Sequence, residues 1–249
     1  MSEFPQVVVI NLERAADRRK MMAEHLDAMG IEHRFQAAVD GKLLTPEQKK
    51  LYARSKAYLH LNRDLHPNEL GCSLSHVEAW RLAAELDGPL IVLEDDIEVH
   101  DDFCSMIEAR ADWLPADWDV VNFGHDIAKP VNLKPIAHEH GPAKSLCEFE
   151  GVVARTGAYM VSPTAARKLL ECALPVSRPA DDILGDQAYN GLKIYGIVPR
   201  IALWRTEDDC PSMIWESGDR QEFFNQSRSS KAGIFFRAYR RLRKLIQGS

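Results

Sequence analysis

The apolar and polar positions of the chain predict strands that alternate with helices. Apolar runs within 6–10 and 89–93 are typical of strands buried on both faces. Other strands are expected over 32–38, 119–123, 151–161 and 193–198, and helices over 17–29, from 45 onward, and over 73–86, 163–172 and 182–192. We expect 56–68 to be irregular and 125–148 to form a loop or a loose hairpin. This alternation predicts an α/β sandwich with a mostly parallel central sheet.

Three consecutive carboxylates, Glu94, Asp95 and Asp96, follow the second apolar run directly. A buried charge is costly unless it is paired or bound to a metal, so the acids should emerge where the strand leaves the core. Mg²⁺ and Mn²⁺ favour oxygen ligands and would relieve the repulsion between neighbouring acids. Ligands of α/β sheets bind beyond the carboxyl ends of strands, where this triplet falls. A solvated acidic turn is the alternative.

Composition indicates one sizeable domain. The chain has 249 residues, 45% of them hydrophobic, and we expect residues 1–222 to fold as a single unit. Five widely spaced cysteines without a CxxC pair favour reduced thiols and a cytoplasmic location over disulfides or a zinc–cysteine site. The first residues, 1–5, have neither the basic nor the apolar region of a secretory signal.

Charge separates the body from the C-terminal tail. Residues 1–222 hold 24 bases and all 37 acids, a net charge of −13, whereas 223–249 hold seven bases and no acid. The acidic body argues against binding to nucleic acid. From Phe235 onward the tail predicts a basic amphipathic helix, which suits a peripheral membrane anchor. The alternative is that its apolar face packs on the body and its bases meet the acidic charge.

Several short motifs occur in an order that resembles glycosyltransferase family 25. This family includes bacterial lipooligosaccharide glycosyltransferases and is similar to the collagen galactosyltransferases. The resemblance runs from about residue 6 to 215 and is carried by 9–12 (VINL), 17–19 (DRR), 38–41 (AVDG), 69–76 (ELGCSLSH), 93–96 (LEDD), 157–162 (GAYMVS) and 179–182 (PADD). The ordered set is specific, although each motif alone is weak.

The resemblance implies a GT-A-like (Rossmann-like) nucleotide-sugar-binding fold and a Mn²⁺ or Mg²⁺ ion. It also implies inverting transfer from a UDP-sugar, commonly UDP-galactose, to a sugar hydroxyl of a lipooligosaccharide or lipopolysaccharide acceptor. Such a glycolipid or oligosaccharide acceptor would place the enzyme on the cytoplasmic face of the inner membrane. Glu94, Asp95 and Asp96 occupy the place of the DxD motif, with Asp96, assisted by Glu94, as the expected metal ligand. Glutamate at the first position departs from that motif and puts the ribose contact in doubt.

Donor-binding residues are expected near this triplet. Arg18 or Arg19 would contact the diphosphate, unless both are ordinary exposed helix residues. Asn11 would contact uracil or ribose, or only cap the next helix. His76 would face a substrate or be structural, and Ser73 or Ser75 is expected to cap the helix that follows. The further expected donor contacts are Leu12, Asp40, Gly41, Ser75, Glu94 and Asp95.

Inverting transfer requires a base to accept the proton of the acceptor hydroxyl. The family pattern favours Asp181, and Asp182 is the second candidate; the alternative for either residue is a helix cap. Two other functions use the same residues. One is a metal-dependent hydrolase or phosphatase, and the other is a non-catalytic nucleotide-binding protein on a transferase scaffold.

Overall fold

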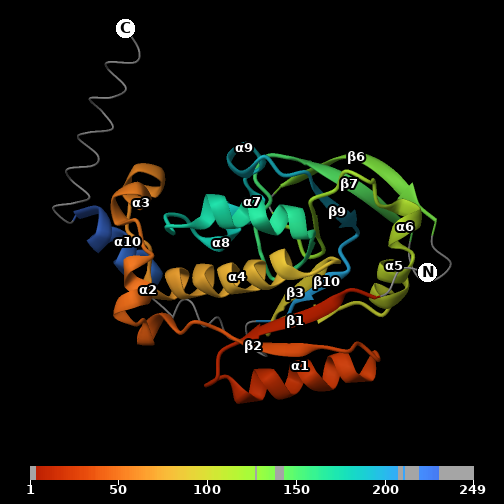
Figure 1. Ribbon diagram of the computed structural model, residues 1–249, viewed down its shortest axis with the longest axis horizontal. Helices are drawn as coiled ribbons and strands as arrows, with labels where there is room; N and C mark the ends of the chain where they lie inside the picture. Colours follow the sequence, from red (N-terminus) through yellow and green to blue (C-terminus); the bar gives the residue numbers. More distant parts are fainter. Residues whose placement is uncertain (1–3, 127, 138–142, 207–209, 211–218, 230–249) are drawn as a thin grey trace, which may run out of the picture. The chain divides into compact units, whose positions relative to one another are not determined.

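The computed structural model describes residues 4–126, 128–137, 143–206, 210 and 219–229 (Figure 1). The chain divides into two compact units, and each is described by itself. Unit 1 comprises 1–38, 75–172 and 180–211, and unit 2 comprises 39–74, 173–179 and 212–249. The part of the predicted amphipathic tail beyond Ser229 lies outside the described residues. None of the described helices is both long and apolar enough to cross a bilayer.

Unit 1 is built on an eight-stranded sheet in the order β2-β1-β3-β8-β5-β9-β7-β6. Strands β7 and β8 are antiparallel to both of their neighbours, so the other six strands run in one direction. The predicted α/β class with a mostly parallel sheet is confirmed. The strands are β1 (Gln6–Asn11), β2 (Arg34–Ala37), β3 (Leu90–Glu94), β5 (Val120–Asn122), β6 (Lys129–Ile136), β7 (Lys144–Glu150), β8 (Ala158–Val161) and β9 (Ile194–Val198).

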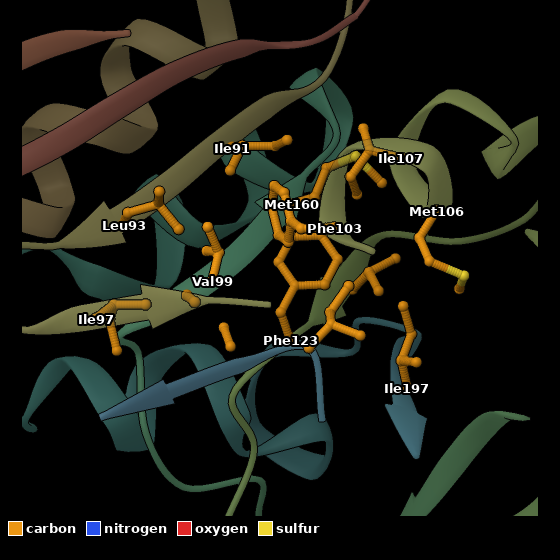
Figure 2. Close-up of a cluster of buried hydrophobic side chains, with 14 of the residues drawn as sticks. Ile91, Leu93, Ile97, Val99, Phe103, Met106, Ile107, Phe123, Met160 and Ile197 are labelled. Atoms are coloured by element: carbon orange, nitrogen blue, oxygen red, sulfur yellow. The ribbon is translucent and has the colours of Figure 1, made fainter. Parts of the chain in front are cut away.

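The core of unit 1 explains why the two apolar runs become central strands. Leu90–Leu93 is fully buried because strand side chains alternate between the faces and both faces of this sheet are covered. Ile91 and Leu93 belong to the cluster drawn in Figure 2, which also holds Met22 and Leu26 of α1 (Ala16–Ala28). In the same cluster Phe103 meets Phe123 edge to face, with 5.2 Å between ring centroids.

Two parts of unit 1 differ from the sequence expectation. The strand expected over 151–161 begins only at Ala158, because β7 already ends at Glu150 and a connecting segment follows. The helix expected over 182–192 is broken into α8 (Ala180–Gly185) and α9 (Gln187–Asn190), because the Asp186 carboxylate accepts the N–H of Tyr189 and starts a new helix. The other elements are α5 (Phe103–Glu108), α6 (Arg110–Trp113), α7 (Pro163–Ala173), and the antiparallel pair β4 (Ile97–Val99) and β10 (Ala202–Trp204).

The region predicted as a loop or loose hairpin forms the antiparallel hairpin β6–β7. Strand β6 lies at one end of the sheet order. Its register shifts between Val131 and Lys134, where Asn132 adopts a φ of 53°. It also contains Pro130 and Pro135.

Unit 2 is mainly helical. It contains η1 (Gly41–Leu43), α2 (Pro46–Lys50), α3 (Arg54–Leu61), part of α4 (Pro67–Glu85) and α10 (Asp219–Ser229). The helix predicted from 45 onward is confirmed by α2, which Thr45 caps: Thr45 and Gln48 exchange side-chain and backbone hydrogen bonds as a capping box. The irregular structure predicted over 56–68 is confirmed only for 62–66. Helix α3 continues to Leu61 and ends at Asn62, which has a left-handed φ of 58°.

Helix α4 begins at Pro67, six residues before the predicted start at Ser73. A proline at the first helical position and an acid in the first turn mark this earlier start, and Glu69 accepts the backbone N–H of His66. Ser73 and Ser75 therefore lie inside the helix and do not cap it. The Ser73 hydroxyl instead donates to the carbonyl of Glu69.

Candidate functional site

The acidic triplet lies at the carboxyl end of β3, beside the end of β1. The two strands are parallel neighbours, with Ile10 opposite Glu94. Asn11, the last residue of β1, therefore reaches Asp95, and its Nδ2 donates to Asp95 Oδ2 over 2.7 Å. The expected position of the acids, where a buried strand leaves the core, is confirmed.

Asp95 is bound by neighbouring side chains through both carboxylate oxygens. Besides the Asn11 bond, its Oδ1 accepts a hydrogen bond of 2.8 Å from Arg18 Nη1. Burial alone would lower the pKa of Arg18, but the bond to Asp95 and the negative charges of Asp95 and Asp96 together outweigh burial, and the pKa is raised. Asn11 Nδ2 also donates to the carbonyl of Ala15, so Asn11 anchors the turn before α1 rather than capping an N–H of that helix. Asp95 thus fixes the loop that follows β3.

Asp96 is poorly compensated by comparison. Its Oδ1 is buried without a hydrogen-bond partner among the described residues, and its Oδ2 lies 3.6 Å from Arg18 Nη1. Burial, together with repulsion from Glu94, raises the pKa of Asp96 to about 7. The amide oxygen of Asn11 is likewise buried without a partner in the described structure. Orphaned oxygens of this kind beside an acidic cluster are the donor type that Mg²⁺ and Mn²⁺ prefer, so the residues fit a divalent cation.

Glu94 is held by two side-chain partners. His76 Nε2 lies 3.2 Å from Glu94 Oε1, and Thr156 Oγ1 lies 3.0 Å from the same oxygen. Burial would raise the pKa of Glu94. The hydrogen bond and electrostatic attraction of His76, with the bond from Thr156 and the charge of Arg155, together outweigh burial and lower the pKa. Glu94 is therefore ionised at neutral pH and accepts both bonds.

His76 is fully buried, and both of its ring nitrogens have hydrogen-bond partners. Since ionised Glu94 can only accept, His76 Nε2 carries a proton and donates it. His76 Nδ1 lies 3.0 Å from the Tyr159 hydroxyl, which accepts a hydrogen bond from Trp80 Nε1. His76 thus connects Glu94 to the buried Tyr159 and Trp80. Its contact with Glu94 holds that carboxylate in place at the site.

Asp181, at the start of α8, joins the same network through Thr156. Thr156 Oγ1 lies 2.9 Å from Asp181 Oδ1 as well as 3.0 Å from Glu94 Oε1. Burial and the charge of Glu94 raise the pKa of Asp181, and the bonds from Thr156 oppose this rise only in part. A single hydroxyl proton serves one carboxylate at a time, so Thr156 links the protonation of the two acids.

The remaining predicted site residues are not joined to this network by the described contacts. Arg19 is exposed on α1, and its guanidinium lies 4.1 Å from the Phe35 ring centroid. Leu12 accepts the N–H of Ala15, and buried Ser75 accepts a bond from Gln36 through its carbonyl. Asp182 is partly exposed beside Asp181.

Asp40 and Gly41, two further predicted donor contacts, belong to unit 2. Asp40 caps η1 by accepting the N–H of Lys42 over 2.9 Å. A Cβ at Gly41 would lie 2.3 Å from the carbonyl oxygen of Pro67, so this glycine is required for close backbone packing.

Sequence reasoning missed Thr156 and Arg155. Thr156 directly precedes the Gly157–Ser162 motif, and this adjacency was the available signal. Its role depends on β8 running antiparallel to β3, which brings the start of β8 beside the end of β3. The Glu94 N–H donates to the Gly157 carbonyl over 2.7 Å at this junction.

Comparison with known proteins identifies the family. The model of glycosyltransferase family 25 (LPS biosynthesis protein) matches residues 4–184. A glycosyltransferase 25 family member from Anopheles gambiae is 31% identical over 193 residues, covering 72% of this chain and 31% of the relative. Procollagen galactosyltransferase 1 of Danio rerio is 33% identical over 199 residues, covering 73% and 31%.

A third relative, from Bos taurus, is named a probable inactive glycosyltransferase 25 family member 3 and is 31% identical over 191 residues, covering 73% of this chain and 31% of the relative. The chain therefore spans about a third of the length of the curated relatives it matches. The family match includes the strand, the acidic triplet and Asp181 described above. This chain belongs to glycosyltransferase family 25.

Proposed function

We propose that this protein is a metal-dependent, inverting glycosyltransferase. It transfers a sugar from a UDP-sugar to a sugar hydroxyl of a lipooligosaccharide or lipopolysaccharide acceptor. The observation that carries the proposal is Asp96 Oδ1, at the carboxyl end of β3 in a family 25 chain, which is buried and has no hydrogen-bond partner within the described part of the chain. A carboxylate oxygen in that state lacks a compensating donor, and a divalent cation would supply the missing positive charge.

Asp96 would hold the cation, with Glu94 and the amide oxygen of Asn11 beside it. A bound Mn²⁺ or Mg²⁺ would act as a Lewis acid that stabilises the negative charge of the leaving diphosphate. Asp95 and Arg18 do not need to leave their mutual ion pair for this, since they position the loop. Ordered carboxylates of this kind preorganise the site before the donor arrives.

Asp181 is the proposed general base. Its raised pKa brings it closer to neutral pH, where a base is most effective once it has lost its proton. Replacing Asp181 with asparagine should lower kcat by roughly 10²–10⁴-fold, the usual contribution of a general base. Asp182→Asn is the matched control and should keep activity within a few fold. Equal losses in both variants would argue against Asp181 as the base.

Galactose is the proposed sugar, and lipopolysaccharide is the proposed type of acceptor. The names of two relatives, procollagen galactosyltransferases 1 and 2, support galactose. The description of the family as an LPS biosynthesis protein supports the acceptor. A screen of UDP-galactose, UDP-glucose and UDP-N-acetylglucosamine with a deacylated lipooligosaccharide acceptor tests both points. Transfer from another UDP-sugar alone would reject galactose.

The basic tail would attach the enzyme to the cytoplasmic face of the inner membrane. Co-sedimentation of the full chain with vesicles tests this, using a variant in which Arg240, Arg241 and Arg243 are changed to glutamate. The wild type should bind vesicles that contain anionic lipid, and the variant should not. Equal binding by both chains, or none by the wild type, would reject the anchor.

The first experiment measures thermal stabilisation by UDP, GDP and CMP, each with and without Mn²⁺. A ligand at 100 times its Kd stabilises the native state by about 2.7 kcal/mol. UDP should raise Tm only with the metal, and Asp96→Ala should abolish the effect. Asp101→Asn, which changes an exposed acid nearby, should retain it. Metal-independent stabilisation of all variants would reject the proposed cation site.

A second candidate is a nucleotide-binding protein without transferase activity. The inactive family 25 relatives of Bos taurus and Homo sapiens favour considering it. This candidate predicts stabilisation by UDP but no sugar transfer with any donor and acceptor. Hydrolysis of the UDP-sugar without an acceptor would instead support the hydrolase alternative.

A further inference from the structure

Arg155 places a guanidinium group beside the acidic cluster. Its Cζ lies 4.6 Å from the ring centroid of Trp204, and its Nε lies 3.4 Å from Asp126 Oδ2. The side chain is 47% exposed, so its remaining N–H groups are accessible. The backbone of Arg155 has a φ of 80°, a left-handed conformation that arginine seldom adopts. Strained backbone of this kind is often found at functional sites.

Trp204, on which Arg155 lies, is fixed next to the acids. A Cβ at Gly124 or Gly157 would lie 2.9 or 2.6 Å from atoms of the indole, so the two glycines leave room for the ring. Trp204 pairs with Ile97 in the β4–β10 ladder, and the next N–H, of Arg205, donates to the carbonyl of Asp96. The strained residue also directly precedes Thr156, which bonds Glu94. Arg155 is thus attached to the cluster from two sides.

The other arginines near the cluster have different roles. Arg18 is only 12% exposed and binds Asp95. Arg205 is 16% exposed, and its Nη1 lies 3.8 Å from Glu98. Neither offers the accessible planar fork that recognises phosphate oxygens in a bidentate manner. Arg155 does, and its ion pair with Asp126 is between side chains that are 47% and 43% exposed, so a phosphate can displace Asp126 at little cost.

We propose that Arg155 binds the diphosphate of the nucleotide-sugar donor and that Asp126 pairs with it only when the donor is absent. The proposal rests on the proposed function, because it assigns a contact to the donor of that reaction. The Trp204 ring and the left-handed backbone hold the guanidinium at the edge of the acidic cluster. There it adds a positive charge where negative charge accumulates on the leaving group.

The test is calorimetric titration of UDP and of UMP, both with saturating Mn²⁺, into four full-length proteins: the wild type, Arg155→Met, Arg155→Gly and Asp126→Asn. Loss of a charge-assisted phosphate contact should weaken UDP binding by about 10- to 100-fold in both Arg155 variants. UMP, which has one phosphate fewer, should lose less. Asp126→Asn should bind UDP as tightly as the wild type or more tightly, because the competing carboxylate is gone.

Arg155→Gly guards against misfolding, since glycine adopts the positive φ without strain. Its urea midpoint should equal or exceed that of the wild type while its UDP affinity falls. UDP affinity within twofold of the wild type in both Arg155 variants would overturn the proposal. It would also be overturned if Asp126→Asn weakened UDP binding as much as the Arg155 variants do, because the ion pair would then be structural. No UDP binding by the wild type would reject the proposed function together with this contact, whereas binding by the wild type and both Arg155 variants rejects the contact alone.

Discussion

Two aspartates, the partly buried Asp96 and the buried Asp102, follow β3 within a few residues but have opposite environments. Asp102 forms an ion pair with Lys144 at 2.9 Å and accepts a hydrogen bond of 2.8 Å from His100. Together these interactions outweigh the effect of burial and lower the pKa of Asp102. Asp96 has an oxygen for which the described residues supply no hydrogen-bond partner, and burial and repulsion raise its pKa to about 7. Asp102 is therefore a carboxylate that stabilises the fold, whereas Asp96 is the carboxylate that we propose binds a cation.

The largest effect should come from removing the partner of the compensated aspartate. The Lys144 and Asp102 side chains are 1% and 4% exposed, so Lys144→Met leaves a buried charge unpaired. We expect the free energy of unfolding to fall by about 3–5 kcal/mol, measured by urea denaturation. The double variant with Asp102→Asn should recover part of the loss. A loss below about 1 kcal/mol in Lys144→Met would contradict the conclusion that the ion pair with Lys144 compensates Asp102.

Asp96→Asn should change the free energy of unfolding in the direction opposite to Lys144→Met. The folded pKa of Asp96, about 7, lies above its usual value of 3.8, so the native state binds the proton more tightly than the unfolded state. Its contribution to stability is therefore full below about pH 4 and is lost as the pH rises to 7.

Without metal at pH 8, Asp96→Asn should be more stable than the wild type by on the order of 1–3 kcal/mol, and at pH 4 the two should be similar. Urea denaturation at both pH values measures this difference. Asp102→Asn in the same assay should be destabilised at pH 8. An unchanged pH dependence in Asp96→Asn would show that Asp96 is already compensated in solution.

Thr156→Val tests whether the bonds from Thr156 control the pKa of Asp181. The bonds from Thr156 lower the pKa of Asp181, so their loss raises it further. The acidic limb of the pH–rate profile for sugar transfer should move to higher pH, and the stability should fall by about 1 kcal/mol. Thr156→Ser keeps the hydroxyl and should restore the wild-type profile. An unshifted limb in Thr156→Val would separate Asp181 from the rate-determining ionisation.

The smallest effect is expected at an exposed ion pair. Lys193 and Asp117 are in contact, but their side chains are 56% and 55% exposed, so water screens the charges. Lys193→Met should leave the urea midpoint unchanged within error. A loss comparable with that of Lys144→Met would mean that burial does not account for the difference between the two lysines.

The contrast between Asp96 and Asp102 also shows what the sequence could predict. Strand β3 and the position of the site could be predicted from the apolar run 89–93 and the three acids that follow it. Both features depend only on residues that are neighbours in the sequence. The parallel pairing of β1 and β3 brought Asn11 and Arg18 to the acids, as their places at the end of one strand and the start of a helix suggested.

Partners supplied by antiparallel strands could not be predicted in the same way. Lys144 begins β7, and Thr156 precedes β8, both far along the chain from the acids that they bind. Nothing in the local pattern indicates which acid each will meet, because the pairing depends on strand order and direction. For this reason the sequence identified Glu94 and Asp181 as candidate site residues but could not show that Thr156 contacts both, or that Lys144 pairs with Asp102.

Strand β6 has a consequence for how the protein behaves at high concentration. A strand at the end of a sheet offers unpaired N–H and C=O groups to other molecules. In β6, Pro130 and Pro135 have no N–H to offer, exposed lysines repel a second copy, and the register shift near Asn132 interrupts a regular ladder. Changing both prolines to valine would remove part of this protection, and the resulting chain should aggregate more readily through this edge.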